Sequence, residues 1–172
     1  MKIGIPKEIH AGEKRVATTP DVAKQLIKLG FEVAIEAGAG AAAHYSDASY
    51  VEAGVTVIKN AQEVWTDSDI ILKVCVPEMH PELKKEEIDL LHENQILITF
   101  LWPAQNPEML KKLAEKKVTA LAMDMIPRIS RAQKLDALSS MANIAGYRAV
   151  VEAAQHFGRF FTGQITAAGK VP

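Results

Sequence analysis

Five polar side chains between residues 128 and 139 are the best candidates in this sequence for contacting a ligand. They are Arg128, Arg131, Gln133, Asp136 and Ser139, and they stand between an apolar segment and a long helical pattern. Arginine supplies a planar fork of donors, glutamine and serine both donate and accept, and aspartate accepts strongly. Such a set can read a carboxamide and a ribose, or bind phosphate through the arginines. The same composition also suits a capped helix start with surface charges, so the residues alone leave both interpretations open.

Two further charged positions could serve a site. Arg15 stands in a charged loop, residues 6–16, directly after the first apolar segment, and its planar fork could clamp a carboxylate. A solvated charged loop is an equally good interpretation. Lys73 is alone in the apolar run Ile70–Val76, where a buried lysine is costly unless it is paired. It therefore either points outward at the end of a strand or serves a site.

A glycine-rich segment resembles a phosphate-binding turn but lacks the context of one. Gly38–Ala43 matches G-x-G-x-x-A after an apolar strand. A dinucleotide site of that kind also needs an acid at the end of the next strand to bind a ribose. Here the next strand, Thr56–Ile58, is followed by Lys59 and Asn60. We interpret the segment as a tight turn that needs glycine for its backbone conformation.

Other classes of site are excluded or disfavoured by composition. The five histidines show no metal-ligand spacing, and no G-x-S-x-G motif is present, so we expect neither a metal site nor a nucleophilic catalytic residue. The single cysteine, Cys75, lies in an apolar run, and we expect it to be a small core residue. The balance of 20 basic against 21 acidic residues argues against a nucleic-acid-binding surface. Its most apolar segment, Ile96–Ala104, is about half the length that crosses a bilayer.

Short apolar runs alternate with helical patterns along the chain, which predicts a doubly wound α/β fold, Rossmann-like or flavodoxin-like, with a mainly parallel sheet. The last predicted strand places the 128–139 residues at the carboxyl edge of this sheet, and a long interdomain helix follows them. The predicted strands are Lys2–Ile5, Glu32–Glu36, Thr56–Ile58, Ile70–Val76, Gln95–Phe100 and Val118–Ala122. The predicted helices are residues 20–29, Asp47–Ala53, Ala61–Trp65, one that starts at Asn106-Pro107, and Asp136–Phe157.

The sequence resembles the N-terminal region of the alanine dehydrogenase / nicotinamide nucleotide transhydrogenase family over essentially its whole length. Six short segments are shared with both branches of the family, and five are typical of the transhydrogenases. The shared segments are Ile3–Glu8, Arg15-Val16-Ala17, Thr19-Pro20, Ile35-Glu36, Gly38-Ala39-Gly40 and Ile71–Val74. The transhydrogenase-like segments are Trp102–Pro107, Pro127–Gln133, Asp136–Ser140, Ala142–Arg148 and Phe160–Pro172.

The resemblance implies the NAD(H)-binding component of a proton-translocating transhydrogenase. In that family a hydride passes between NAD(H) on this component and NADP(H) on a separate one, and a membrane component couples the exchange to proton movement. A homodimer that is cytoplasmic and peripheral to the inner (cytoplasmic) membrane through its partners is expected, without a catalytic side chain of its own. The family's nicotinamide-side contacts map onto Arg128, Ile129, Ser130, Arg131, Gln133, Asp136 and Ser139.

Two alternatives remain beside this hypothesis. Alanine dehydrogenases resemble the chain in Arg15 and Lys73, which there hold and activate the amino or oxo acid. They also use a histidine where this chain has Trp102, and an indole cannot transfer a proton. Oxidative deamination needs an acid–base group, whereas hydride exchange between two nicotinamides needs mainly positioning. The other alternative is a non-catalytic dimerisation or docking fragment.

The resemblance also predicts how the chain is divided. Residues 1–135 form an N-terminal α/β domain, and 136–172 are the long helix and a linker toward a nucleotide-binding Rossmann domain with its own G-x-G-x-x-G, which this sequence does not contain. We therefore expect these residues by themselves to be inactive and to bind NAD(H) weakly.

Overall fold

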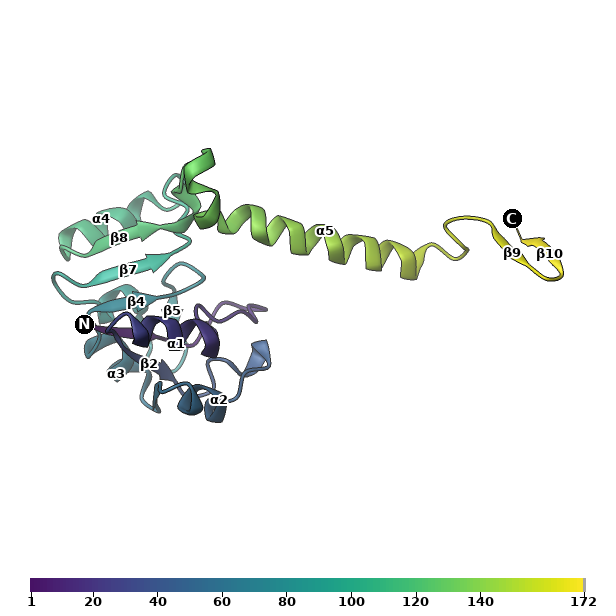
Figure 1. The fold of residues 1–172 in the computed structure, drawn as a ribbon. Coiled ribbons are helices and arrows are strands. Elements are labelled where there is room, and N and C mark those ends of the chain that lie inside the picture. Colours follow the sequence, from purple (N-terminus) through teal and green to yellow (C-terminus); the bar gives the residue numbers. More distant parts are fainter. Residues whose placement is uncertain (172) are drawn as a thin grey trace. The chain divides into compact units, whose positions relative to one another are not determined.

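The computed structural model describes residues 1–171, and these divide into two compact units, Met1–Met125 and residues 126–171. Each unit is described by itself. Unit 1 contains a six-stranded sheet in the order β3-β2-β1-β4-β7-β8, in which every neighbouring pair is parallel (Figure 1). Counted along the sheet this is the 3-2-1-4-5-6 order of a Rossmann fold, with the reversal of direction between β1 and β4. The strands are β1 Lys2–Ile5, β2 Glu32–Glu36, β3 Thr56–Ile58, β4 Ile70–Leu72, β7 Ile96–Thr99 and β8 Thr119–Ala122.

The helices that connect the strands begin and end at the expected signals. They are α1 Pro20–Lys28, α2 Asp47–Glu52, α3 Ala61–Thr66 and α4 Pro107–Glu115. Thr19 caps α1 by accepting a hydrogen bond from the amide of Val22, and the chain leaves the helix through Gly30 at a φ of 94°. Asn106 precedes α4 but makes no side-chain cap. Its amide group instead donates to the carbonyl oxygens of Leu101 and Trp102.

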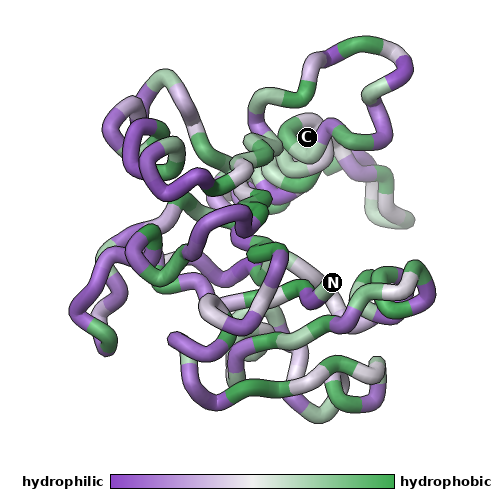
Figure 2. Tube along the Cα trace, turned by 90° about the vertical axis from the view of Figure 1, so that its left-hand side faces the viewer, coloured by the Kyte–Doolittle hydropathy of each residue, from purple (hydrophilic) through white to green (hydrophobic). Residues whose placement is uncertain are grey.

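Side chains of alternating direction cover both faces of the sheet. Ile3, Ile5 and Ile35 pack with α1 and α2, while Ile71 and Leu97 point to the other face and pack with Trp65 of α3 and Leu113 of α4. The turns of the surface helices carry both hydrophilic and hydrophobic residues (Figure 2), as expected for helices that bury one side. Helices on both faces of a parallel sheet confirm the predicted doubly wound α/β fold.

Strand β4 is shorter than predicted and ends before Lys73. The sequence predicts it to run to Val76, but β4 ends at Leu72. The amides of Val74 and Cys75 are hydrogen-bonded by the carboxylate of Glu8, at 2.6 and 3.2 Å, and not by a neighbouring strand. A side chain from after β1 therefore ends this strand.

Residues 79–90 add a small β-hairpin and a helical turn to unit 1. The hairpin pairs β5 Met79–His80 with β6 Lys85–Glu86, and the 3₁₀ helix η2 Glu87–Leu90 follows directly. Two further 3₁₀ turns in the unit are η1 Ala41–Ala43 and η3 Met123–Met125.

Unit 2 consists of a 3₁₀ helix η4 Ser130–Leu135, the 20-residue helix α5 Ala137–His156 and a terminal hairpin. The hairpin pairs β9 Gln164–Thr166 with β10 Gly169–Val171, so residues that the sequence suggests to be a linker form an antiparallel ladder. Within residues 1–171, no helix combines the length and the apolar composition needed to cross a membrane.

Candidate functional site

The predicted contact residues lie at the start of unit 2. Ile129 is extended, Ser130, Arg131 and Gln133 are on η4, and α5 begins after Asp136. Arg128, Arg131 and Gln133 are exposed and make no side-chain hydrogen bond within residues 126–171. Their donors are therefore available to a ligand, as a binding segment requires.

Asp136 is the organising acid of this segment. Its carboxylate accepts hydrogen bonds from the Ser139 amide at 3.0 Å and the Ser139 hydroxyl at 2.6 Å, and so caps α5. These two bonds, with a smaller contribution from the charge of Arg128, lower the pKa of Asp136. The group is thus an ionised acceptor, and it holds the Ser139 side chain in one orientation.

A buried ion cluster lies at the carboxyl edge of the sheet in unit 1. The Lys73 ammonium lies 3.1 Å from a carboxylate oxygen of Glu87 and 3.3 Å from one of Glu8, and all three side chains are buried. The ammonium also stands 5.8 Å from the centroid of the Trp65 ring. Lys73 therefore does not point outward to solvent, but is buried and paired with Glu8, from the loop after β1, and with Glu87, the first residue of η2.

The two carboxylates of this cluster also accept hydrogen bonds from backbone amides, Glu8 from those of Val74 and Cys75. Glu87 accepts from the amide of Glu78 at 3.0 Å, in addition to its bond with Lys73. Burial raises the pKa of Glu87, and the Lys73 charge and the Glu78 backbone oppose that rise. Each charge has a partner, and both carboxylates also accept hydrogen bonds from backbone amides, so the cluster meets the conditions for burying ions.

Arg15 forms an ion pair with Glu13, an acid of the same loop. Its Nε and Nη2 atoms donate to the two carboxylate oxygens of Glu13, at 2.8 and 2.6 Å. The bidentate bond lowers the pKa of Glu13 to about 2, and the same pair raises the pKa of Arg15. The guanidinium is therefore already matched by a carboxylate, with about half of its side chain exposed.

Cys75 is not the core residue that the sequence suggests. It is partly exposed, and its thiol donates to Glu13 at 3.3 Å. Burial, and then the hydrogen bond with Glu13, raise the pKa of the Cys75 thiol to about 12, so the group is a weak nucleophile. The prediction was wrong because β4 ends at Leu72 instead of continuing to Val76, so the side chain of Cys75 belongs to a loop. A cavity of about 190 Å³ adjoins Glu13 and Arg15, lined by Lys7, Glu8, Glu13, Arg15, Gly38, Ala39, Ala41 and Ala42.

The glycine-rich segment on the far side of that cavity is a turn, in agreement with its interpretation. Gly38 has a φ of 75°, and its amide donates to the carboxylate of Asp47. A side chain at Gly40 would collide with the ring of Tyr50 and the carbonyl of Tyr45. Both glycines are therefore explained by conformation and packing.

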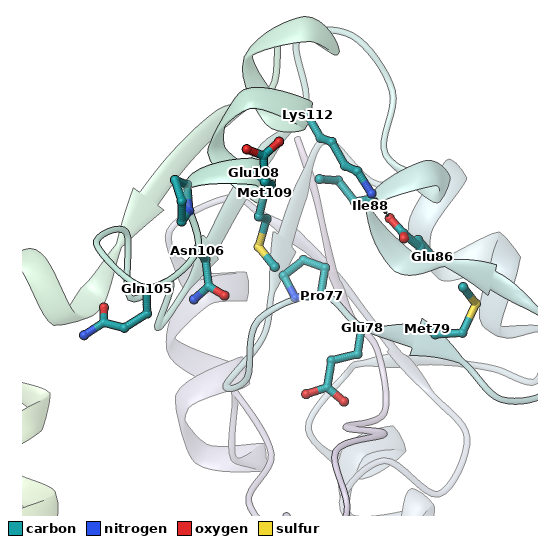
Figure 3. A pocket seen from close by; sticks show the side chains of 11 residues that line it. Pro77, Glu78, Met79, Glu86, Ile88, Gln105, Asn106, Glu108, Met109 and Lys112 are labelled. Carbon is teal, nitrogen blue, oxygen red and sulfur yellow. Dashed lines mark hydrogen bonds and ion pairs between the residues drawn. The ribbon is translucent and has the colours of Figure 1, made fainter.

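A second, larger cavity of about 480 Å³ lies between the β5–β6 hairpin and α4 (Figure 3). Lys112 and Glu86 form an ion pair at one rim, and Met109 and Pro77 provide apolar surface. No candidate residue of the sequence analysis lines it.

Two acids that organise unit 1 were missed as functional candidates. Glu87 stands outside any recognisable motif and reaches Lys73 only through the fold. Asp124 follows the last strand by two residues, and its carboxylate accepts from the amides of Leu101 and Trp102. An acid within two residues of the end of a strand is a signal that could have identified Asp124, whereas nothing local identifies Glu87.

Comparisons with known proteins place the chain. The family model described as alanine dehydrogenase/PNT, N-terminal domain, matches residues 4–145. The NAD(P) transhydrogenase subunit alpha of Cereibacter sphaeroides is 59% identical over the whole chain, which covers 32% of that protein. A crystal structure of transhydrogenase from Sinorhizobium meliloti matches with a TM-score of 0.88 and 38% sequence identity. The match covers the whole of this chain and 49% of the Sinorhizobium meliloti chain. An alanine dehydrogenase of Methanococcus maripaludis is 36% identical over the whole chain and 44% of its length.

The chain thus spans between about a third and a half of the relatives that it matches. The transhydrogenase subunit is more similar than the alanine dehydrogenase, and the predicted resemblance is confirmed. The chain belongs to the alanine dehydrogenase/PNT N-terminal domain family.

Proposed function

We propose that this chain is the N-terminal part of the NAD(H)-binding component of a proton-translocating NAD(P) transhydrogenase. The observation that carries the proposal is the set of unengaged donors on Arg128, Arg131 and Gln133, next to the ionised carboxylate of Asp136. The 59% identity with a transhydrogenase alpha subunit supports the same assignment.

The chemistry of these residues fits a nicotinamide nucleotide. Gln133 can both donate to and accept from a carboxamide, and the ionised Asp136 can accept from a ribose hydroxyl or an amide. The guanidinium groups of Arg128 and Arg131 suit phosphate or carbonyl oxygens. Ile129, Ser130 and Ser139 complete the proposed contact surface. The bound nucleotide supplies the hydride chemistry, and these residues supply position.

We further propose the arrangement around this chain. NAD(H) binds here, NADP(H) binds a separate component, and a membrane component couples their exchange to proton movement. The protein is a cytoplasmic homodimer, peripheral to the inner membrane through these partners. Residues 1–135 act as one domain, and 136–172 lead toward a Rossmann domain that binds the rest of the nucleotide.

An amino-acid dehydrogenase is not favoured. Arg15, which would clamp the substrate carboxylate, is matched by Glu13, and Lys73 is buried between Glu8 and Glu87. Trp102 offers no proton to the substrate carbon. The third alternative is a docking fragment without a role in catalysis. It gives no reason for the exposed donors of Arg131 and Gln133 on η4.

The test is hydride transfer from NADH to an NADP⁺ analogue by the full-length protein with its partner components. Arg128→Ala and Asp136→Asn each remove one proposed contact, and we expect each to lower the transfer rate about tenfold or more and to weaken NADH binding. Lys134→Ala is the matched control, because it removes an exposed charge from the same 3₁₀ helix.

Two results would overturn the proposal. One is full transfer activity in both contact variants. The other is NADH oxidation that depends on pyruvate and ammonia, with no transfer to the NADP⁺ analogue, which would establish the amino-acid dehydrogenase instead.

A further inference from the structure

The cavity of about 480 Å³ between the β5–β6 hairpin and α4 has the size of a small-molecule site (Figure 3). It lies wholly within unit 1, and its lining comes from residues 77–79, from residues 86 and 88, and from residues 105–112. None of the proposed nucleotide contacts is among them. The ligand that this cavity can hold therefore has to be inferred from the side chains that line it.

Hydrogen bonds within unit 1 hold both walls of the cavity. On the hairpin side, the Glu87 carboxylate accepts from the amide of Glu78 at 3.0 Å and from the ammonium of Lys73 at 3.1 Å. The carbonyl oxygen of Glu78 accepts from the amide of Glu87 at 2.9 Å. On the α4 side, the Asn106 side chain donates to two backbone carbonyl oxygens. The cavity is thus preformed, and a ligand loses little binding free energy to ordering its walls.

Part of the lining is apolar. Ile88 is 3% exposed and belongs to a core cluster against which Met109 packs. Pro77 is also buried, and Met79, which is 59% exposed, adds apolar surface that is open to solvent. Methionine side chains are unbranched and polarizable, so they adapt to the shape of what they contact. This surface suits the alkyl stem of a ligand.

The polar groups of the lining that lack a partner are mainly acceptors. Asn106 uses its Nδ2 atom for two carbonyl oxygens, and within residues 1–171 its Oδ1 atom has no hydrogen bond. The Glu108 carboxylate has no partner in the same part of the chain. Glu78 contacts His10 through Oε1 at 2.5 Å, which leaves its second oxygen. Only the Gln105 amide can also donate. A ligand that fits these groups supplies donors.

The charges of the lining favour a ligand with two positive charges. Three carboxylates, those of Glu78, Glu86 and Glu108, stand against the single ammonium of Lys112, which leaves two negative charges. Lys112 pairs with Glu86, so Glu78 and Glu108 have no lysine or arginine partner within residues 1–171. The positive end of α4 would by itself favour an anion, but Glu108 already supplies that charge in its first turn.

The two carboxylates without a basic partner are separated by the apolar surface. In Figure 3 the side chains of Glu108 and Glu78 lie on opposite sides of Met109 and Pro77. A ligand with one charged end would therefore leave one of these carboxylates unmatched. A ligand with a charged group at each end and an apolar stem between them would match both.

We propose that this cavity binds a small organic dication, with two ammonium or guanidinium groups on an apolar stem. One end donates to Glu108, the other to Glu78, and the stem packs on Met109 and Pro77. Hydrogen bonds between charged partners are about twice as strong as neutral ones, so the two ends provide the specificity. The site shares no residue with the proposed nucleotide contacts, and the inference does not depend on the proposed function.

The experiment uses full-length protein with ¹³C-labelled methionine methyl groups, because Met79 and Met109 line the cavity. Their nuclear magnetic resonance signals are assigned by replacing each with leucine. The probes are hexane-1,6-diammonium, hexylammonium, hexane-1,6-diol and adipate, which share a six-carbon chain and differ in their ends. We expect the dication to shift both signals with a Kd about tenfold lower than that of the monocation or the diol. Adipate should give no saturable shift.

Four variants test the role of charge. Glu108→Gln and Glu78→Gln each remove one charge and keep the shape, so each should raise the Kd of the dication about tenfold and leave that of the diol unchanged. Glu115→Gln is the matched control, because it removes an exposed charge from the last position of the same helix. Lys112→Met leaves Glu86 without its cation and should lower the Kd of the dication about threefold or more.

The opposite directions of these effects separate charge recognition from damage to the cavity, because damage would weaken binding in every variant. The proposal is wrong if the dication binds no tighter than the diol, or if adipate gives the larger shifts. It is also wrong if Glu108→Gln weakens the dication and the diol equally, or if no probe shifts Met79 or Met109 in the wild type. The proposed function survives each of these results, since it rests on other residues.

Discussion

The buried lysine of unit 1 offers the sharpest test of how the carboxyl edge is held together. Lys73→Met keeps a side chain of similar length and removes the charge between Glu87 and Glu8, which lie 3.1 and 3.3 Å from the ammonium. Both carboxylates are then left buried without a counter-ion. Removing one partner of a buried pair costs about 3–5 kcal/mol, because the remaining charge is unsolvated.

The cost should fall at the lower end of that range. Glu8 keeps its bonds to the amides of Val74 and Cys75, and Glu87 keeps its bond to Glu78. Such charge-assisted bonds partly replace the lost cation. We therefore expect a loss of about 3 kcal/mol at pH 8, or a melting temperature lower by about 6–12 °C for a chain of this size.

The loss should also depend on pH. Burial raises the pKa of Glu87 and the Lys73 charge opposes that rise, so removing the cation raises the folded-state pKa of Glu87 further above its ordinary value. A group with a raised folded-state pKa contributes stability below its unfolded pKa and loses it as pH rises through the folded value. The deficit of the variant should therefore be small near pH 5 and should grow toward pH 8.

Thermal unfolding followed by far-UV circular dichroism at pH 5, 6, 7 and 8 measures this dependence. Lys24→Met is the matched control, since it removes the same charge from an exposed pair with Asp21, where about 0–1 kcal/mol is expected. Adding Glu87→Gln to Lys73→Met should recover part of the loss. A deficit below about 1 kcal/mol that does not change with pH would refute this account of the cluster.

Two other residues of the same edge give simpler predictions. Glu13 has a pKa of about 2 instead of 4.5, so it contributes stability above pH 4.5 that is lost as pH falls toward 2. Urea unfolding measured at a series of pH values gives the free energy of unfolding. In Glu13→Gln, the fall of this free energy between pH 4.5 and pH 2 should be smaller by about 1–2 kcal/mol, after allowance for the half-exposed Arg15. Gly40→Ala should destabilise by about 1–3 kcal/mol in the same assay, because the new methyl group would stand 2.6 Å from a ring carbon of Tyr50. An unchanged midpoint for Gly40→Ala would contradict the packing explanation of that glycine.

The sheet was predictable because its signals are local. Apolar runs such as Glu32–Glu36 and capping residues such as Thr19 act within a few residues, and the structure has the strand and the helix there. The end of β4 was not predictable in this way. The amides of Val74 and Cys75 donate to Glu8, which is 66 residues away from Val74, and only the fold brings them together.

In the candidate site, too, the features that depend on neighbouring residues were predictable and those that depend on the fold were not. The exposed donors of residues 128–139 could be predicted from their composition and their place before a helix, and the cap by Asp136 follows from its position. The pairing of Arg15 with Glu13 is also local, but the sequence leaves open whether that arginine faces solvent, a ligand or an acid. The strained conformation of Trp102 has no sequence signal, since tryptophan is not expected at a positive φ.

Acidic side chains that accept from backbone amides are the common device of the carboxyl edge in unit 1. Glu36 binds the amide of Lys7, Asp47 binds that of Gly38, and Asp124 binds that of Trp102. Each of these bonds fixes a loop whose backbone has no strand to pair with, because loops beyond the strand ends have lost their ladder partners. Side chains on such loops can then stay exposed and still be held in place, since their orientation no longer depends on their own packing. A ligand that meets a preformed surface of this kind loses less binding free energy to ordering the protein. The acids that hold these loops therefore also fix the backbone from which the exposed side chains of this edge project, as Asp124 does for Trp102.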